Sequence, residues 1–132
     1  MKYISTRNNN TFIDFERVSL KGLASDGGLY LPKDWCDDEN FKFSKKEIFF
    51  ESIAYNIFKN FIGDAIKHSE LKNIISLSYK KFDSKEVTPL QKLEDNHWLL
   101  ELFHGPTLAF KDIALQFLGN LFNFFLEKND NK

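Results

Sequence analysis

One lysine of this sequence stands where covalent chemistry could be done. Lys111 follows a Gly-Pro turn at residues 105–106, and most of its neighbours in the chain are apolar. Apolar surroundings would desolvate the amine and favour its neutral form, and a neutral amine is the nucleophile that forms an imine with a carbonyl compound. The alternative is that the side chain extends to water and covers apolar surface with its methylene groups.

The segments around Lys111 predict a strand, a turn and a helix, in that order. Residues 98–103 (WLLELF) are almost continuously apolar, which is typical of a strand buried on both faces of a parallel sheet flanked by helices. A helix is then predicted to start near Lys111. In open α/β sheets, ligands bind beyond the carboxyl ends of the strands, and the free N–H groups of a helix start favour an anionic ligand.

The first third of the chain predicts short strands joined by turns. Residues 11–23 predict a short strand followed by a short helix. Residues 26–28 (DGG) predict a tight turn, because glycine adopts positive φ without a Cβ clash. Residues 29–31 predict a strand that ends at Pro32.

Two amphipathic helices are predicted next. Ser44 and Glu47 form a capping box, and apolar residues then recur at helical spacing as far as Ala65. A second helix is predicted at about residues 69–81, and residues 83–90 are predicted to be a connector. Such an alternation of strands and helices indicates the α/β class.

Composition argues against several classes of partner. The 18 basic and 19 acidic residues nearly cancel, so no nucleic-acid or anionic-membrane surface is indicated. Cys36 has no second cysteine to pair with, which fits a reducing compartment. No secretion signal or membrane span is evident. His97 and His104, an odd number apart, would point to opposite faces of a strand, so no metal site is predicted. A soluble, cytoplasmic protein is expected.

The last helix is apolar on most of its sides. Its polar positions form one narrow stripe, and apolar residues cover the rest, including Phe117, Phe124 and Phe125. Such a helix requires neighbours on most sides, and a buried parallel strand requires further strands. We therefore expect the 132 residues to be a piece of a larger α/β protein, with self-association through the exposed carboxyl-terminal helix.

Three segments resemble one enzyme family. Residues 102–112 (LFHGPTLAFKD) closely resemble the cofactor-lysine segment of threonine synthases, which are pyridoxal-phosphate (PLP) enzymes of the tryptophan-synthase-β fold type. Residues 3–7 (YISTR) resemble the opening of that family, and residues 22–32 (GLASDGGLYLP) resemble its amino-terminal signature. Asn8 stands where the family usually has glycine, and no Gly-rich phosphate loop follows Lys111.

The resemblance implies a fold, a cofactor and a reaction. Residues 1–84 would be a small amino-terminal α/β domain, and residues 85–132 the truncated start of a PLP fold-type-II three-layer domain. The family converts O-phospho-L-homoserine and water to L-threonine and phosphate, as a carbon–oxygen lyase acting on a phosphate ester. Lys111 would be the catalytic and cofactor-binding residue, holding PLP as a Schiff base and then moving protons during the reaction.

Three neighbours of Lys111 are further candidates for the cofactor site. His104 could contact cofactor or substrate, or its ring could hydrogen-bond the loop backbone. Thr107 could cap the helix or donate to a ligand, and the cap is the preferred interpretation. Asp112 could complement the positive end of the helix or take part in the site.

Three functional hypotheses follow. The first is an amino-terminal portion of threonine synthase that is inactive in isolation, because the phosphate loop is missing. The second is a non-catalytic, stand-alone interaction module derived from the enzyme. The third is a small carbonyl-binding enzyme that uses Lys111 by itself.

Overall fold

The computed structural model describes residues 1–35 and 49–130. Along the chain the elements are β1 (Lys2–Ser5), β2 (Ile13–Asp14), α1 (Phe15–Lys21), β3 (Tyr30–Pro32), α2 (Phe50–Ile62), the 3-10 helix η2 (Gly63–Ala65), α3 (His68–Tyr79), β4 (Leu90–Glu94), β5 (His97–Leu100) and α4 (Asp112–Asp130). The described residues form two compact units. The first unit holds residues 1–35 and 53–71, and the second holds residues 49–52 and 72–130.

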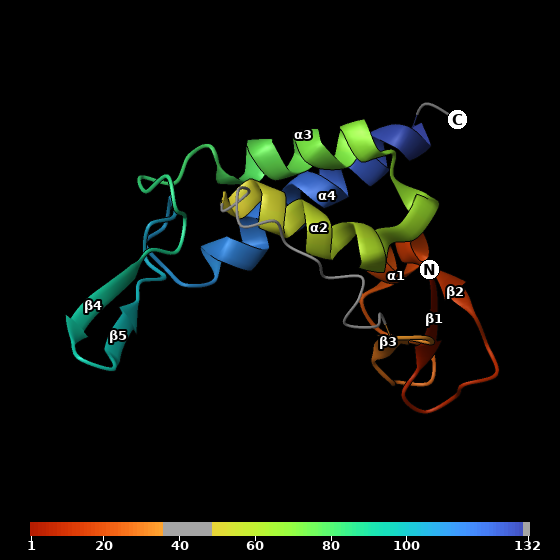
Figure 1. Cartoon of the computed structure of the whole chain (residues 1–132). Helices are drawn as coiled ribbons and strands as arrows, with labels where there is room; N and C mark the ends of the chain where they lie inside the picture. Colours follow the sequence, from red (N-terminus) through yellow and green to blue (C-terminus); the bar gives the residue numbers. More distant parts are fainter. Residues whose placement is uncertain (36–48, 131–132) are drawn as a thin grey trace. The chain divides into compact units, whose positions relative to one another are not determined.

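The first unit is built on a small antiparallel sheet. Strand β1 lies between β2 and β3 (Figure 1) and pairs antiparallel with both. The side chain of Tyr3 on β1 is buried, and its hydroxyl donates to the carbonyl of Phe61 at 2.6 Å, which ties the sheet to the end of α2. Asp14 caps α1 by accepting from the N–H of Arg17 at 2.9 Å, so the strand and helix predicted at residues 11–23 are confirmed.

The predicted Asp-Gly-Gly turn is confirmed, and one carboxylate organises it. The side chain of Asp26 accepts from the N–H of Gly28 at 2.9 Å and from the hydroxyl of Ser5 at 2.8 Å. The hydrogen bond from Gly28, and then that from Ser5, hold the pKa of Asp26 below its ordinary value. A Cβ on Gly28 would lie 2.1 Å from the Ser5 oxygen, so the turn requires glycine at this position.

The two predicted long helices are present. Helix α3 spans His68–Tyr79, close to the predicted residues 69–81. Helix α2 spans Phe50–Ile62 and is followed by η2, in agreement with a helix that ends near Ala65. The capping box predicted at Ser44 lies outside the described residues.

In the second unit, α3 and α4 are joined by hydrogen bonds between buried or partly buried groups. The hydroxyl of Tyr79 on α3 donates to the carbonyl of Ile113 at 2.9 Å, and the amide of Asn120 donates to the hydroxyl of Ser78 at 3.1 Å. The ring of Tyr79 also meets Phe50 edge to face at 4.7 Å. Burial raises the pKa of the Tyr79 hydroxyl to about 12, so the group stays a hydrogen-bond donor at neutral pH.

The strand predicted at residues 98–103 differs from the observed strand in its pairing and in its burial. Strand β5 pairs antiparallel with β4 in a hairpin, and its side chains are exposed on both faces, including Trp98 and Leu99. The prediction of a doubly buried parallel strand is therefore wrong for the described residues. Its partner strand is formed by residues 90–94, for which the sequence analysis predicted almost no structure. Asn96, in the turn between the two strands, adopts the positive φ of 62° that the tight turn requires.

Helix α4 begins at Asp112, as predicted to within a residue. Its polar positions Gln116 and Asn120 face inward, where they bond Asp112 and Ser78. Phe125 is completely buried, so it cannot belong to the exposed apolar surface for which it was proposed. Among the described residues no helix, α4 included, is both long enough and apolar enough to span a bilayer.

The Tyr79 hydrogen bond yields a stability prediction. Replacing Tyr79 by Phe removes the donor to the Ile113 carbonyl and is expected to lower the free energy of unfolding by about 1 kcal/mol. The pKa of Tyr79 is raised to about 12 in the folded state. The difference in free energy of unfolding between the two proteins is therefore largest below the unfolded tyrosine pKa of about 10, and it disappears as pH rises through the folded value. Urea denaturation of both proteins across this range measures the difference, and a pH-independent difference would contradict it.

Candidate functional site

Lys111 is the residue immediately before α4, at the end of residues 105–111, the lysine loop. It is exposed, and its amine makes no hydrogen bond or ion pair with the residues that the structure describes. The predicted apolar enclosure is wrong for these residues, because Leu108 and Phe110 expose 69% and 64% of their surface. The loop side chains point outward because a different group, the carboxylate of Asp112, fills its interior.

The carboxylate of Asp112 accepts the hydrogen bonds that hold the lysine loop together. Its carboxylate, only 3% exposed, accepts from the N–H of Thr107 at 2.7 Å and from the Thr107 hydroxyl at 2.9 Å. Gln116, one helical turn further on, donates to the same carboxylate at 3.1 Å. Thr107 therefore binds a side chain and does not cap α4, which starts five residues later. The loop is closed by a charged group at the positive end of the helix.

Burial and hydrogen bonding act in opposite directions on Asp112. Burial raises the pKa of the carboxyl group, but the hydrogen bonds from Thr107 and Gln116 outweigh it, so the pKa lies below its ordinary value. A lowered folded-state pKa means that this carboxylate stabilises the fold above its unfolded pKa of about 3.9, and that the contribution is lost as pH falls through the folded value. At neutral pH the loop therefore surrounds a full negative charge.

Two backbone positions show how closely the loop wraps this carboxylate. A Cβ on Gly105 would lie 2.4 Å from the Cβ of Asp112, so only glycine fits beside it. Leu108 has φ of 61° and its N–H donates to the carbonyl of Gly105 at 3.0 Å. Positive φ costs a leucine about 1–2 kcal/mol, a strain that is typical of segments with a functional role.

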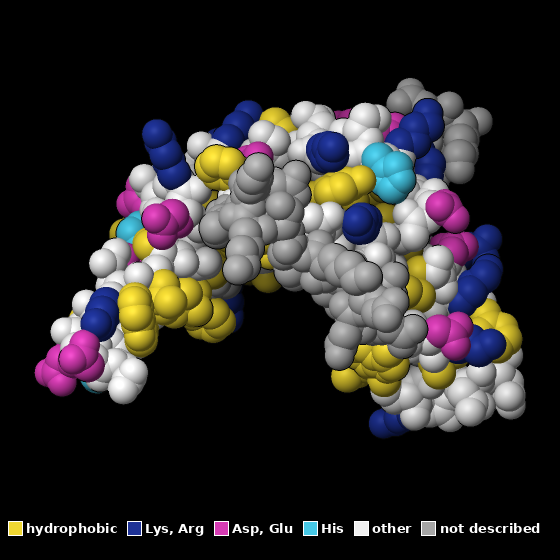
Figure 2. Space-filling view, viewed as in Figure 1, with side chains coloured by type: hydrophobic (Ala, Val, Ile, Leu, Met, Phe, Trp, Pro, Cys, Tyr) yellow, Lys and Arg dark blue, Asp and Glu magenta, His cyan; other side chains and the backbone are white. Residues whose placement is uncertain are grey.

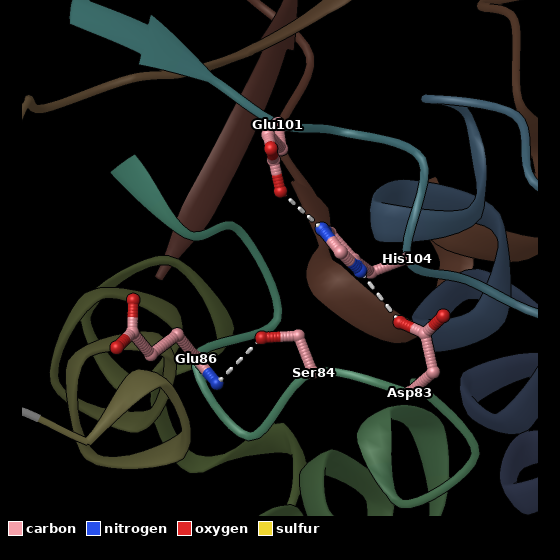
Figure 3. Close-up of polar contacts among 5 residues, drawn as sticks. All are labelled: Asp83, Ser84, Glu86, Glu101 and His104. Atoms are coloured by element: carbon pink, nitrogen blue, oxygen red, sulfur yellow. Dashed lines mark hydrogen bonds and ion pairs between the residues drawn. The ribbon is translucent and has the colours of Figure 1, made fainter. Parts of the chain in front are cut away.

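His104, directly before the lysine loop, is held by two carboxylates. Figure 3 shows the imidazole between Glu101 and Asp83, with one ring nitrogen directed at each. Nδ1 lies 2.6 Å from Asp83 Oδ1, and Nε2 lies 2.7 Å from Glu101 Oε2. The ring thus bonds side chains, and not the loop backbone that the sequence suggested. Its hydrogen bonds to Glu101 and then Asp83 raise the pKa of His104 above its ordinary value.

The sequence analysis missed both partners of His104. Glu101 lies three residues before the histidine, a short spacing that could have drawn attention to the pair. Asp83 lies 21 residues away, and no local pattern indicates that the chain returns to it. The described residues hold no group of three or more His, Cys, Asp or Glu side chains arranged for a metal ion.

Similarity to known proteins places this chain in a family. A family model described as the threonine synthase N terminus matches residues 2–79, more than half of the chain. The chain belongs to the threonine synthase family. The resemblance seen at residues 3–7 and 22–32 lies within the matched region, and the lysine loop lies beyond it.

Individual threonine synthases match the lysine loop as well. The chain is 44% identical to the enzyme of Schizosaccharomyces pombe and 42% identical to that of Pseudomonas aeruginosa, and both alignments cover all of it. The chain spans only 26% and 28% of the length of these two relatives. It is therefore similar to about a quarter of each enzyme.

Solved threonine synthase structures share the fold. The crystal structure of the yeast enzyme matches 99% of this chain with a TM-score of 0.90 and 40% identity, over 27% of its own length. The crystal structure of the PLP-bound enzyme from Brucella melitensis matches 98% of this chain with a TM-score of 0.86 and 34% identity, over 28% of its length. The described chain is thus a small mixed α/β portion that matches the amino-terminal part of these enzymes.

Two glycines of the second unit make a matched test of the loop geometry. Gly105→Ala forces a Cβ against Asp112 and is expected to lower the free energy of unfolding by about 1–3 kcal/mol, the usual cost of overpacking. Gly119→Ala, within α4, meets nothing within 4 Å and is expected to raise it by up to about 1 kcal/mol through helix propensity. Denaturation midpoints of both variants test the contrast, and an equal effect of the two substitutions would contradict it.

Proposed function

We propose that this chain is the amino-terminal portion of a PLP-dependent threonine synthase, with Lys111 as the amine that holds the cofactor. The observation that carries the proposal is the placement of Lys111: an exposed amine without a partner among the described residues, at the end of a loop closed on Asp112. The family match and the PLP-bound relative from Brucella melitensis support it. Residues 1–84 form the amino-terminal domain in this proposal, and residues 85–132 open the cofactor domain.

The described residues fit PLP in one specific respect. A carbonyl cofactor needs an accessible amine that no neighbouring group withholds, and the Lys111 amine meets this condition. When bound, PLP supplies the electron sink for the reaction. Thr107 and Asp112 hold the loop that carries the amine, and they act on the site by fixing its position.

Lys111 has a second task in the proposed reaction. The substrate is O-phospho-L-homoserine, which reacts with water to give L-threonine and phosphate in the cytoplasm. With the cofactor and substrate bound, the Lys111 amine would move protons at the α and β carbons as general base and acid. The bond between the γ carbon and the phosphate oxygen breaks as phosphate leaves, the γ carbon gains a proton to become the methyl group, and the hydroxyl of water adds at the β carbon.

The isolated chain is proposed to be inactive. No Gly-rich segment that could bind a phosphate follows Lys111 in these 132 residues, and two apolar side chains of the lysine loop, Leu108 and Phe110, are exposed. An active site of this kind must be enclosed against bulk solvent, and the lysine loop alone does not provide an enclosure. Threonine formation by the purified chain alone would contradict this.

A chimeric enzyme tests the proposed function. Residues 1–132 of this chain replace the matched 27% of yeast threonine synthase, and threonine formation from O-phospho-L-homoserine is measured. Borohydride reduction followed by mass spectrometry locates the pyridoxyl adduct, which is expected on Lys111. Lys111→Ala should abolish both the adduct and turnover, whereas Lys81→Ala, at another exposed lysine, should leave both unchanged.

Two outcomes of the chimera experiment oppose the proposal. A pyridoxyl adduct on a residue other than Lys111 would remove the lysine from its role. Turnover that persists in the Lys111→Ala chimera would do the same. A visible imine absorption when PLP is added to the isolated chain, lost in Lys111→Ala, would instead favour the small carbonyl-binding enzyme.

A second candidate function is a non-catalytic interaction module that self-associates. Exposed apolar side chains favour it. On α4, Leu115, Leu118 and Leu126 expose 53%, 37% and 52% of their surface, and their spacing places them on one side of the helix. Hydrophobic side chains also gather on the surface over β4 and β5 (Figure 2). Apolar patches of this kind mark interaction surfaces.

Self-association through α4 is tested by adding charge to its exposed apolar side. The chain is expected to form dimers or larger species by light scattering, and Leu126→Lys should shift them towards the monomer, because a buried unpaired charge is costly. Asn123→Lys, at an exposed polar position of the same helix, serves as the control and should have little effect. A monodisperse monomer in the unmodified chain would exclude this association.

A further inference from the structure

We propose that His104 is a positioning residue for the lysine loop: as a cation bound by Asp83 and Glu101, it fixes the point at which the loop begins. The role in catalysis rests on the proposed function of Lys111. The clamp itself rests only on the geometry of the three side chains. It joins Asp83, after α3, to residues 101–104, which follow β5, and it depends on the positive charge of the histidine.

The hydrogen bonds define the protonation of the ring. Nδ1 is 2.6 Å from a carboxylate oxygen of Asp83, and Nε2 is 2.7 Å from one of Glu101. An ionised carboxylate only accepts hydrogen bonds, so a ring that bonds two of them must carry a proton on both nitrogens. His104 is thus an imidazolium with both N–H groups in use. It retains no lone pair with which to accept a proton or bind a metal.

Each partner anchors a different segment. Asp83 follows α3, and its backbone N–H donates to the carbonyl of His104 at 3.0 Å, so the two residues are paired twice. Glu101 follows β5, and its N–H donates to the carbonyl of Pro89 at 3.0 Å. The ring of Phe103 stacks on the imidazole at 4.8 Å. His104 therefore joins the end of α3 to the base of the hairpin.

The lysine loop is held at both of its ends. His104 precedes the loop, and its next neighbour, Gly105, packs directly against Asp112 at the other end. Any movement of His104 is thus passed through a single tightly packed residue to the peptide that carries Lys111. A displacement of about 1 Å at a reacting group can cost about a hundredfold in rate, so the placement of the clamp bears on turnover.

Only two charged side chains bond the imidazole among the described residues: Asp83, from the loop after α3, and Glu101, from the end of β5. The nearby Glu86 contributes its backbone N–H to Ser84 Oγ at 3.2 Å, and Figure 3 shows its carboxylate directed away from the imidazole. The raised pKa of His104 agrees with this surplus of negative charge. The clamp is complete below the unfolded histidine pKa of about 6.5 and is lost as pH rises through the folded value.

Nuclear magnetic resonance of the chain tests the clamp without any enzyme assay. The three histidines are labelled with ¹⁵N in their rings and assigned with His104→Gln and His97→Gln. We expect the His104 ring to carry a proton on both nitrogens below the ordinary histidine pKa of about 6.5, and to lose one with a midpoint above that value. Backbone amides of residues 105–111 should shift with the His104 midpoint, and this titration should vanish in His104→Gln and persist in His97→Gln.

The chimera tests what the clamp does for Lys111. His104→Gln is expected to lower kcat between about tenfold and a hundredfold and to reduce the yield of the pyridoxyl adduct on Lys111. His97→Gln, in the exposed hairpin, should stay within about twofold of the unmodified chimera. The protonated fraction of His104 falls as pH rises. The difference in kcat between the unmodified chimera and the His104→Gln chimera should therefore become smaller at higher pH.

The two experiments separate the clamp from the proposed function. A His104 midpoint at or below the ordinary histidine pKa of about 6.5, or amides of residues 105–111 that do not follow its titration, would overturn the clamp. Equal kcat and adduct yield in the His104→Gln and unmodified chimeras would overturn its positioning role. An unmodified chimera that forms no threonine, combined with the expected resonance titration, would reject the proposed function of Lys111 and leave the clamp standing.

Discussion

The carboxylate of Asp112 is the group on which the arrangement of the lysine loop depends. It lies at the first position of α4, nearly inaccessible to water, and it receives both the backbone and the hydroxyl of Thr107. A buried charge is tolerated only when hydrogen bonds replace its hydration, so the loop must keep its donors directed at this point. Lys111 is adjacent to Asp112 in the chain. The hydrogen bonds of Asp112 therefore fix the position of Lys111, although the Lys111 amine makes none of them.

Opposite charges hold the two ends of this loop. Before it stands His104, bonded to two carboxylates, and after it stands Asp112, bonded to three neutral donor groups. Neither contact relies on apolar burial, which the loop residues lack. This explains how a precise backbone path, with a leucine at positive φ, occurs in a segment whose hydrophobic side chains are exposed. Those side chains remain available for contacts with other protein surfaces.

The family relationship offers an explanation for the exposed apolar side chains of this chain. The chain spans about a quarter of the length of the threonine synthases it matches. Several of its exposed apolar residues lie on the hairpin, on the lysine loop and along one side of α4. In the proposed function these surfaces would meet the remainder of the enzyme, and the amine would be enclosed there. In the alternative of an interaction module, the same surfaces would meet another copy of the chain. Both proposals start from one physical fact, the cost of leaving such surface in water.

The sequence by itself determined the elements that depend on near neighbours. The helix at His68–Tyr79, the start of α4 at Asp112 and the Asp-Gly-Gly turn follow from spacings of a few residues, and the motif around Lys111 was sufficient to indicate the family. Only the tertiary structure decided that residues 98–100 belong to an exposed hairpin, that Gln116 and Asn120 face inward, and that His104 meets Asp83 from 21 residues away. An apolar run has the same local pattern whether it is covered or not, and a histidine gives no local sign of the carboxylate that will bond it. Contacts of that kind exist only once the chain has closed on itself.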